Sequence, residues 1–151
     1  MRPRDLLTFL HAAIGVAINR GRDRVSAADI EKAEEGYSED MLLSMAFELR
    51  DVNSAIIDVL YNFTRTPPRL THEQVTAILS GTEKSAQVPD QLIGLLLWFG
   101  FLGVQEYDQD DLTYSYQVRY NVEKLRAPIA RGKASYAIHP AFHKALQTRP
   151  E

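Results

Sequence analysis

Apolar side chains recur every three to four residues over the first twenty positions of the chain. The series is Leu6, Leu7, Leu10, Ile14, Ala17 and Ile18, and this spacing predicts an amphipathic helix over residues 3–20. Pro3 suits the first turn of such a helix, because its missing N–H has no partner there in any case. Gly21 is a typical residue at which the helix ends.

A second helical segment follows after a short polar interval. Ser26 is a good N-cap, and Asp29 places a negative charge in the first turn, where the helix dipole favours it. The apolar spacing then continues toward Gly36. Ser38 either begins a third helix or follows a kink, and the pattern continues to about Val52.

Beyond residue 52 the pattern predicts shorter elements. Residues 55–63 form an amphipathic stretch, and prolines then interrupt it. Thr71 with Gln74 three residues later has the composition of a capping box, which predicts a short helix that ends at Gly81. A strongly apolar helix is predicted over residues 89–100.

The next segments alternate in the manner of β-strands. We predict one strand over residues 101–106, an acidic turn, and a second strand over residues 112–120, in which Tyr114, Tyr116, Val118 and Tyr120 alternate with polar residues. Residues 135–139 predict a further short strand, and Pro140 begins a final helix. Helix, short helix, longer helix and two-stranded wing is the order of a winged helix-turn-helix. The predicted fold is therefore mainly α, with a helical subdomain over residues 1–51 and a winged-helix domain with a C-terminal strand and helix over residues 52–151.

Composition narrows the classes of function. The 151 residues carry a net charge of −3 and include no cysteine, which removes disulfides, zinc–thiolate sites and thiol nucleophiles. The longest apolar run, residues 92–104, is shorter than the roughly 20 residues that a membrane span needs. We expect a cytoplasmic protein without membrane contact.

Charge is distributed unevenly and bears on nucleic-acid binding. Residues 1–25 and 120–151 are basic, whereas residues 26–51 and 82–119 are acidic. The helix that would read DNA, residues 89–100, contains no lysine or arginine, and the predicted wing tip is acidic, so specific DNA binding is disfavoured. The basic tract Lys124, Arg126, Arg131 and Lys133 leaves it open as an alternative.

The helix over residues 89–100 is apolar on nearly all sides, which leaves two interpretations. The helices of residues 3–50 cover it within the chain, or Ile93, Leu97, Trp98 and Phe101 form an interaction surface for another protein.

Candidate catalytic and metal-binding residues are few. His139 and His143 have the four-residue spacing of some zinc-binding helices, but no third ligand accompanies them, so capping or packing is the preferred interpretation. Paired acids such as Glu34 and Glu35 face apart on a helix and do not converge on one substrate. We predict no catalytic residue, no metal site and no enzyme activity for this chain.

Four stretches together suggest a family. The segment 2–9, which begins Arg-Pro-Arg-Asp, the segments 25–30 and 37–40, and the late segment 136–142 (Tyr-Ala-Ile-His-Pro-Ala-Phe) together resemble the region that follows the nucleotide-binding core in bacterial P-loop ATPases of the STAND and AAA+ kind. The resemblance implies a helical lid over residues 1–51, followed by a winged helix. It also implies that Arg2 and Arg4 sense nucleotide phosphates, for which the planar guanidinium fork is well suited. The chain itself contains no P-loop motif, so ATP and magnesium would belong to the parent protein.

These observations lead to three hypotheses about function. The first is a non-catalytic regulatory and protein-interaction module of a P-loop NTPase switch, in bacterial defence or signalling, whose partners are the upstream nucleotide-binding domain and a further protein or a second copy. The second is a stand-alone winged-helix DNA-binding regulator. The third is a small adaptor that oligomerises through residues 92–104.

Overall fold

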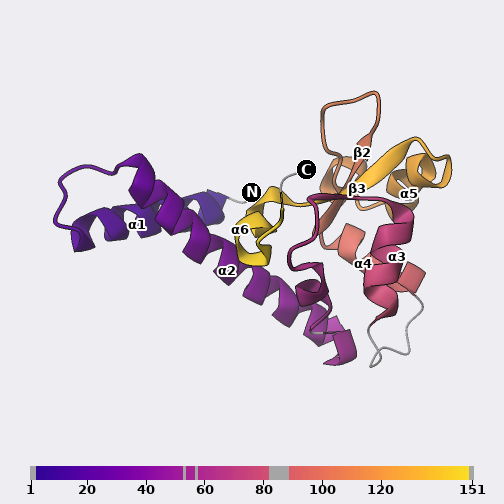
Figure 1. Ribbon diagram of the computed structural model, residues 1–151, viewed down its shortest axis with the longest axis horizontal. Helices are drawn as coiled ribbons and strands as arrows, with labels where there is room; N and C mark the ends of the chain where they lie inside the picture. The colour runs from indigo at the N-terminus through magenta and orange to yellow at the C-terminus, as the bar shows by residue number, and fades with distance from the viewer. Residues whose placement is uncertain (1–2, 53, 57, 82–88, 150–151) are drawn as a thin grey trace.

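A computed structural model describes residues 3–52, 54–56, 58–81 and 89–149 of the chain. Its architecture is mainly helical with a small antiparallel sheet, as the sequence predicts (Figure 1). The helices of the described residues are α1 (Pro3–Asn19), α2 (Ala27–Val52), α3 (His72–Ser80), α4 (Pro89–Trp98), α5 (Val122–Ala130) and α6 (His143–Leu146). The strands are β1 (Arg69–Leu70), β2 (Leu102–Glu106) and β3 (Ala134–Ile138).

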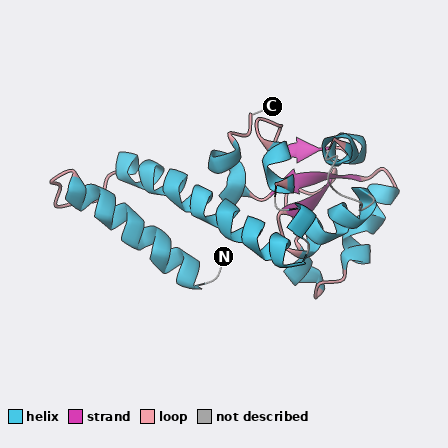
Figure 2. Cartoon of the chain, turned by 90° about the horizontal axis from the view of Figure 1, so that it is seen from below, coloured by secondary structure: helices cyan, strands magenta, loops and turns pink. Residues whose placement is uncertain are grey.

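Helices α1 and α2 form a hairpin that projects from the rest of the molecule as an arm (Figures 1 and 2). Ala13, Ala17 and Ala33 are buried where the two helices meet, because small side chains allow close approach of the backbones. The rings of Phe9 and Tyr37 meet edge to face, 5.6 Å apart, further along the same contact. Helix α2 continues unbroken through Gly36, so there is no separate third helix.

Helix α2 connects the arm to the rest of the chain, which we call the body. Its first half packs on α1 through Ala33, and its second half enters the body core through Leu42, Ala46 and Leu49. Positions 33 and 42 lie on opposite sides of a helix with a 100° turn per residue. One helix therefore packs against both α1 and the body. The predicted boundary between two domains, at residues 51 and 52, stays a prediction.

The sheet has the order β1-β3-β2 and is antiparallel throughout. Strand β3, predicted over residues 135–139, is the central strand, and its Tyr136 lies opposite Val104 of β2. The prediction of a strand over residues 112–120 was wrong. Only Thr113 forms a bridge, to Val104, and the chain then turns into a 3-10 helix over Ser115–Val118.

The physical reason for this error is a set of long-range and turn hydrogen bonds. The buried Ser115 hydroxyl donates to the Trp98 carbonyl at the end of α4, 2.9 Å away. Arg119 and Tyr120 take left-handed backbone angles, with φ of 54° and 58°, which end any extended run. The alternating tyrosines therefore do not lie on two faces of a strand, and alternation alone could not reveal this.

Two further elements differ from the prediction. The stretch over residues 55–63 is not one helix but two 3-10 turns, Ser54–Ile56 and Val59–Phe63, whose apolar side chains still fill the core. Helix α5 was missed because Pro128 lies inside it and signals a helix break. Conversely, the predicted capping box is confirmed, since Thr71 and Gln74 bond reciprocally at the start of α3.

The body core lies between the sheet, α4 and the C-terminal segment. Phe101 stands at its centre, with the rings of Phe63 and Phe142 each 5.2 Å from its own. Four apolar residues of α4 are buried around them, namely Leu92, Ile93, Leu96 and Leu97. Among the described residues no helix is long and apolar enough to cross a membrane.

Candidate functional site

A buried carboxylate fixes the turn between the two helices of the arm. The side chain of Asp29 is fully buried and accepts hydrogen bonds from Arg20 at 2.9 Å and from Arg22 at 3.0 Å. Ser26 adds its backbone N–H at 2.9 Å and its hydroxyl at 2.6 Å. Arg20 follows α1 directly, whereas Asp29 lies in the first turn of α2, so these bonds hold the helices of the hairpin together.

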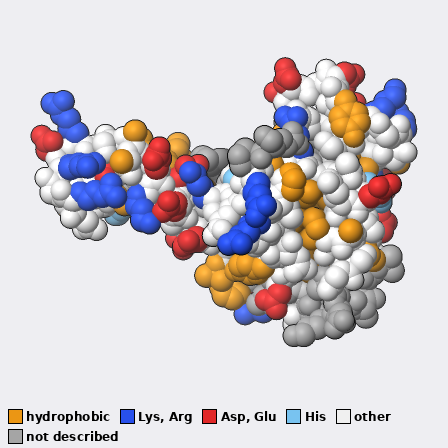
Figure 3. All heavy atoms as spheres, in the orientation of Figure 1, with side chains coloured by type: hydrophobic (Ala, Val, Ile, Leu, Met, Phe, Trp, Pro, Cys, Tyr) orange, Lys and Arg blue, Asp and Glu red, His pale blue; other side chains and the backbone are white. Residues whose placement is uncertain are grey.

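The same contacts determine the charge of Asp29. Hydrogen bonds from the Ser26 hydroxyl and N–H, supported by the two arginines, outweigh the effect of burial and hold the pKa of Asp29 well below its usual range. The predicted cap at Ser26 therefore has an unusual form. Its hydroxyl donates to the first-turn carboxylate, and basic side chains gather at the outer end of the arm (Figure 3).

Helix α1 carries an apolar face that nothing in the described structure covers. Its large side chains are between 46% and 67% exposed, in a molecule whose body core is closed. We call this set the arm face, and its residues are Leu6, Leu7, Leu10, Ile14 and Ile18.

The position of the arm face explains why it is exposed. At 100° per residue, Ala13 and Ala17 point to α2, and the apolar sector widens to one side through Leu7, Ile14 and Ile18. Leu6 and Leu10 lie toward the α2 side and remain exposed. One neighbouring helix cannot cover so wide a sector. Exposed apolar strips of this width are uncommon on protein surfaces.

Comparison with known proteins points to the same segment. Residues 1–46 match the family model described as the FunZ-associated C-terminal helical domain. No curated protein and no solved structure matches the chain. The matched residues contain α1, the turn with Asp29 and most of α2, which is the arm together with the start of its entry into the body.

The four residues of the predicted interaction surface differ in their exposure to solvent. Ile93, Leu97 and Phe101 are fully buried within the chain. The cover differs from the predicted one, because α4 packs mainly against α3, α5 and β2 rather than against the helices of residues 3–50. Trp98 remains 48% exposed. Of the predicted phosphate sensors, Arg2 lies outside the described residues, and Arg4 lies in α1 with a side chain outside the described part.

His139 and His143 both take part in local contacts of the C-terminal segment. His139 caps the 3-10 turn Pro140–Phe142, with Nδ1 accepting from the Ala141 N–H at 3.1 Å. His143 places Nε2 at 2.9 Å from the Ile138 carbonyl. The described residues contain no group of three or more histidines or acids that could hold a metal ion.

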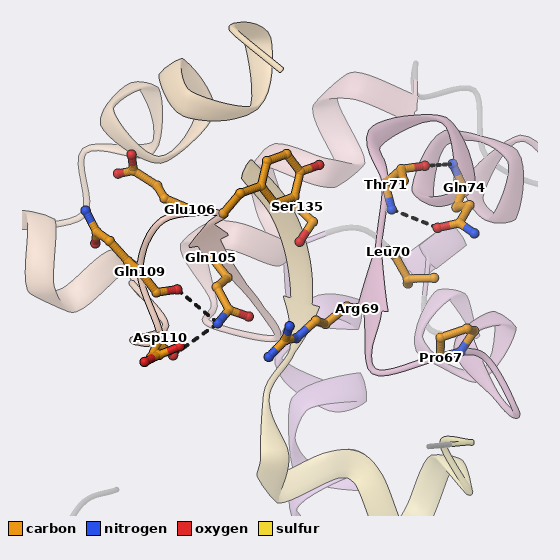
Figure 4. Close-up of a pocket in the computed structure, with 11 residues that line it drawn as sticks. Pro67, Arg69, Leu70, Thr71, Gln74, Gln105, Glu106, Gln109, Asp110 and Ser135 are labelled. Atoms are coloured by element: carbon orange, nitrogen blue, oxygen red, sulfur yellow. Dashed lines mark hydrogen bonds between the residues drawn. The ribbon is translucent and has the colours of Figure 1, made fainter. Parts of the chain in front are cut away.

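One polar pocket of about 420 Å³ lies beside β1 and the start of α3 (Figure 4). Several of its polar groups already have partners within the chain. Thr71 and Gln74 bond each other, and the Gln105 amide donates to the carbonyls of residues 109 and 110. Ser135 faces no histidine in this lining. The hydroxyl groups of Thr71 and Ser135 therefore have no imidazole base beside them in this lining.

The arm face was not recognised as a site from the sequence. The signal was available, because Leu7, Ile14 and Ile18 widen the apolar sector of α1 beyond what one helix contact requires. The missing information was the environment. Only the arrangement of the arm shows that the body does not reach α1 (Figure 2).

Proposed function

We propose that this chain is a non-catalytic protein-interaction module from the C-terminal region of a P-loop NTPase switch protein of the STAND or AAA+ kind. The observation that carries the proposal is the arm face, an apolar strip that no other part of the described chain covers. It lies on α1, which falls within the residues that the family model of a C-terminal helical domain matches. Its occupant in this proposal is the nucleotide-binding domain that precedes the arm. The resemblance to that family would assign phosphate sensing to Arg2 and Arg4.

The body supports a winged-helix interpretation of residues 52–151. Helices α3 and α4 lie between β1 and β2, and the sheet order β1-β3-β2 is that of a winged helix-turn-helix, with α5 inserted into the wing. Its recognition helix, α4, buries four of its ten residues in the core and carries no basic side chain. The wing carries the exposed acids Asp108, Asp110 and Asp111. These features favour a protein partner over DNA.

This arrangement does not support the hypothesis of a small adaptor that oligomerises through residues 92–104. Its proposed surface, residues 92–104, supplies Phe101, Leu102 and Val104 to the core, and all three are buried. A partner that binds these three residues would have to open the body. The arm face requires no such rearrangement.

Two aspartates on the arm face test the proposal in the full-length parent polypeptide. Ile14→Asp with Ile18→Asp places two charges in the contact with the nucleotide-binding domain, and we expect ATP hydrolysis to change by about tenfold or more. We also expect faster tryptic cleavage at Arg22 and Arg24, because the arm is released. Rates are measured by phosphate release.

The control is Ile30→Asp, which makes the same type of substitution once, at an exposed isoleucine of α2. It should leave both the rate and the cleavage pattern close to those of the parent. If the arm-face variant keeps the parental hydrolysis rate and protease resistance, the arm does not dock on the nucleotide-binding domain. A native polypeptide with no nucleotide-binding domain, identified by immunoblot as a band at 17.1 kDa, would likewise overturn the proposal.

A further inference from the structure

A second exposed feature lies on the body, at the end of α2 that is remote from the turn of the arm. A groove of about 510 Å³ runs between α4 and α5, with Val52 of α2 at its edge. Leu95, Trp98 and Val122 give it an apolar lining. Gly94 forms part of the floor, where the Arg126 guanidinium comes within 3.5 Å of the position that a Cβ would take.

The ring of Trp98 lines this groove, and the ring of Tyr120 lies against it from outside the lining. Trp98 is 48% exposed and Tyr120 is 54% exposed, and their ring centroids are 5.5 Å apart. Large aromatic side chains with this much exposed surface are typical of binding sites for other proteins. They belong to different elements, since Trp98 ends α4 and Tyr120 follows the 3-10 helix Ser115–Val118.

The backbone holds this ring pair in place before any ligand arrives. Arg119 and Tyr120 are consecutive non-glycine residues with left-handed angles, a conformation that is unfavourable for L-residues. The Tyr120 N–H donates to the Ser115 carbonyl at 2.7 Å, and the buried Ser115 hydroxyl donates to the Trp98 carbonyl. Ser115 therefore links the backbones of both aromatic residues. This lowers the entropy cost of ordering the backbone when a partner binds.

Charge in the groove selects the kind of occupant. Asp90 and Arg126 line it but neutralise each other, with Arg126 Nη1 3.0 Å from the Asp90 carboxylate. Glu123 also lines the groove and has no ion pair among the described residues. Arg119 and Lys124 are nearby in the sequence, but neither lines it. The lining therefore carries one uncompensated negative charge and one exposed aromatic ring, that of Trp98, which Tyr120 adjoins.

We propose that this groove binds an arginine side chain presented by a partner protein. A guanidinium stacks on the face of Trp98 by a cation–π interaction, and its outer N–H groups donate to the Glu123 carboxylate. A nucleic-acid base could also stack on such rings, but the acids of the lining would repel its phosphates. The groove is a second contact point, and the inference does not depend on the proposed role of the arm.

Trp98 is the single tryptophan of the sequence, so its fluorescence reports on this groove directly. The probe is an acetylated and amidated five-residue peptide with a central arginine flanked by valines, titrated into the intact chain. The same peptide with citrulline in place of arginine keeps the shape and removes the charge. We expect the arginine peptide to change the Trp98 emission saturably and the citrulline peptide to bind about tenfold more weakly.

Variants of the chain then locate the contact. Glu123→Gln should lower the affinity for the arginine peptide by about threefold, as expected for loss of an exposed ion pair. The matched control is Glu73→Gln, because Glu73 is also an acid in the first turn of a helix but lies outside the groove. It should leave the affinity unchanged. Tyr120→Asn, which tolerates the left-handed backbone, should also weaken binding.

The outcomes separate the alternatives. Equal binding of the arginine and citrulline peptides would show a groove for apolar peptides and overturn the proposal. No saturable change up to millimolar peptide would overturn it as well. If Glu123→Gln and Glu73→Gln weaken peptide binding equally, the effect comes from the net charge of the chain rather than from this groove. That result would also overturn the proposal.

Discussion

At the scale of single residues, His139 shows how position determines charge. It follows β3 directly, its Nδ1 accepts from the Ala141 N–H, and its ring centroid lies 4.8 Å from that of Tyr114. Burial lowers the pKa of His139 to about 4 from the ordinary histidine value near 6.5. The folded chain therefore keeps this imidazole neutral at a pH where the unfolded chain would protonate it.

The stability of the chain should consequently fall in mild acid. Between pH 6.5 and pH 4 the unfolded state binds a proton at His139 that the folded state does not, so the free energy of unfolding decreases as the pH drops. The contribution of His139 is fully present above pH 6.5, and its loss is complete below about pH 4. With an allowance for partial exposure of the ring, we expect a loss of about 2 kcal/mol, measured by denaturant unfolding at a series of pH values.

The variant His139→Asn keeps a capping acceptor but does not titrate in this range. Its unfolding free energy should change less between pH 6.5 and pH 4 than that of the parent chain. Parallel curves for the two proteins would show that other groups cause the acid sensitivity.

At the scale of elements, one serine joins α2 to the C-terminal segment. The Ser38 side chain is buried, and its hydroxyl donates to the Ala141 carbonyl at 2.6 Å and accepts from the Ala145 N–H at 3.0 Å. These partners are more than one hundred residues away along the chain. The sequence suggested a helix start at Ser38, but its hydroxyl instead connects two elements.

Removal of this hydroxyl should destabilise the fold. Ser38→Ala leaves a carbonyl and an N–H without their partner in a buried contact, and we expect the free energy of unfolding to fall by about 2 kcal/mol. Urea unfolding followed by circular dichroism measures the change. Ser80→Ala is the matched control, because the exposed Ser80 hydroxyl bonds only within its own helix, and it should cost less than about 0.5 kcal/mol. A Ser38→Ala effect as small as that of the control would contradict the linking role.

The elements also show where sequence reasoning works. Caps and periodicity are local, so α1, α3, α4 and β3 were predicted near their observed positions. The strand predicted over residues 112–120 does not form, because the Ser115 hydroxyl donates to the Trp98 backbone carbonyl and this bond competes with strand pairing. Helix α5 was not predicted from the sequence, because burial of Leu125 and Pro128 outweighs the cost of placing a proline inside a helix.

At the scale of the whole molecule, the arm and the body differ in how they are stabilised. The large core cluster takes residues from α2 to α6 and from the sheet, but none from α1. Helix α1 is held by its contact with α2 and by the Asp29 cluster. Since buried apolar area provides most of the stability, the body should not depend on α1 for its folding.

A shortened chain that begins at Ala27 tests this division. We expect it to keep one cooperative unfolding transition and to lose less than about 2 kcal/mol, because the deletion removes no side chain of the body core cluster. Leu49→Ala in the intact chain is the comparison, and creation of a cavity in the core should cost about 3 kcal/mol. Differential scanning calorimetry measures both. If the shortened chain loses its cooperative transition, α1 is part of the folding unit.

The sequence by itself determined the features that depend on neighbours along the chain. Apolar periodicity, the Thr71 capping box, the acid in the first turn of α2, and the absence of cysteine and of lysine or arginine in α4 could all be found there. These features established a mainly helical chain and disfavoured a DNA-reading helix. They are local because helix and cap energies come from groups within about four residues of each other.

Only the tertiary structure decided which apolar surfaces are covered. Ile93 and Ile14 look alike in the sequence, yet the first is fully buried in the body and the second is half exposed on the arm. Tyr120 stands beside Trp98 only because a left-handed turn brings it there. Such contacts join residues far apart in the chain, and burial depends on the sum of them, which no local pattern contains.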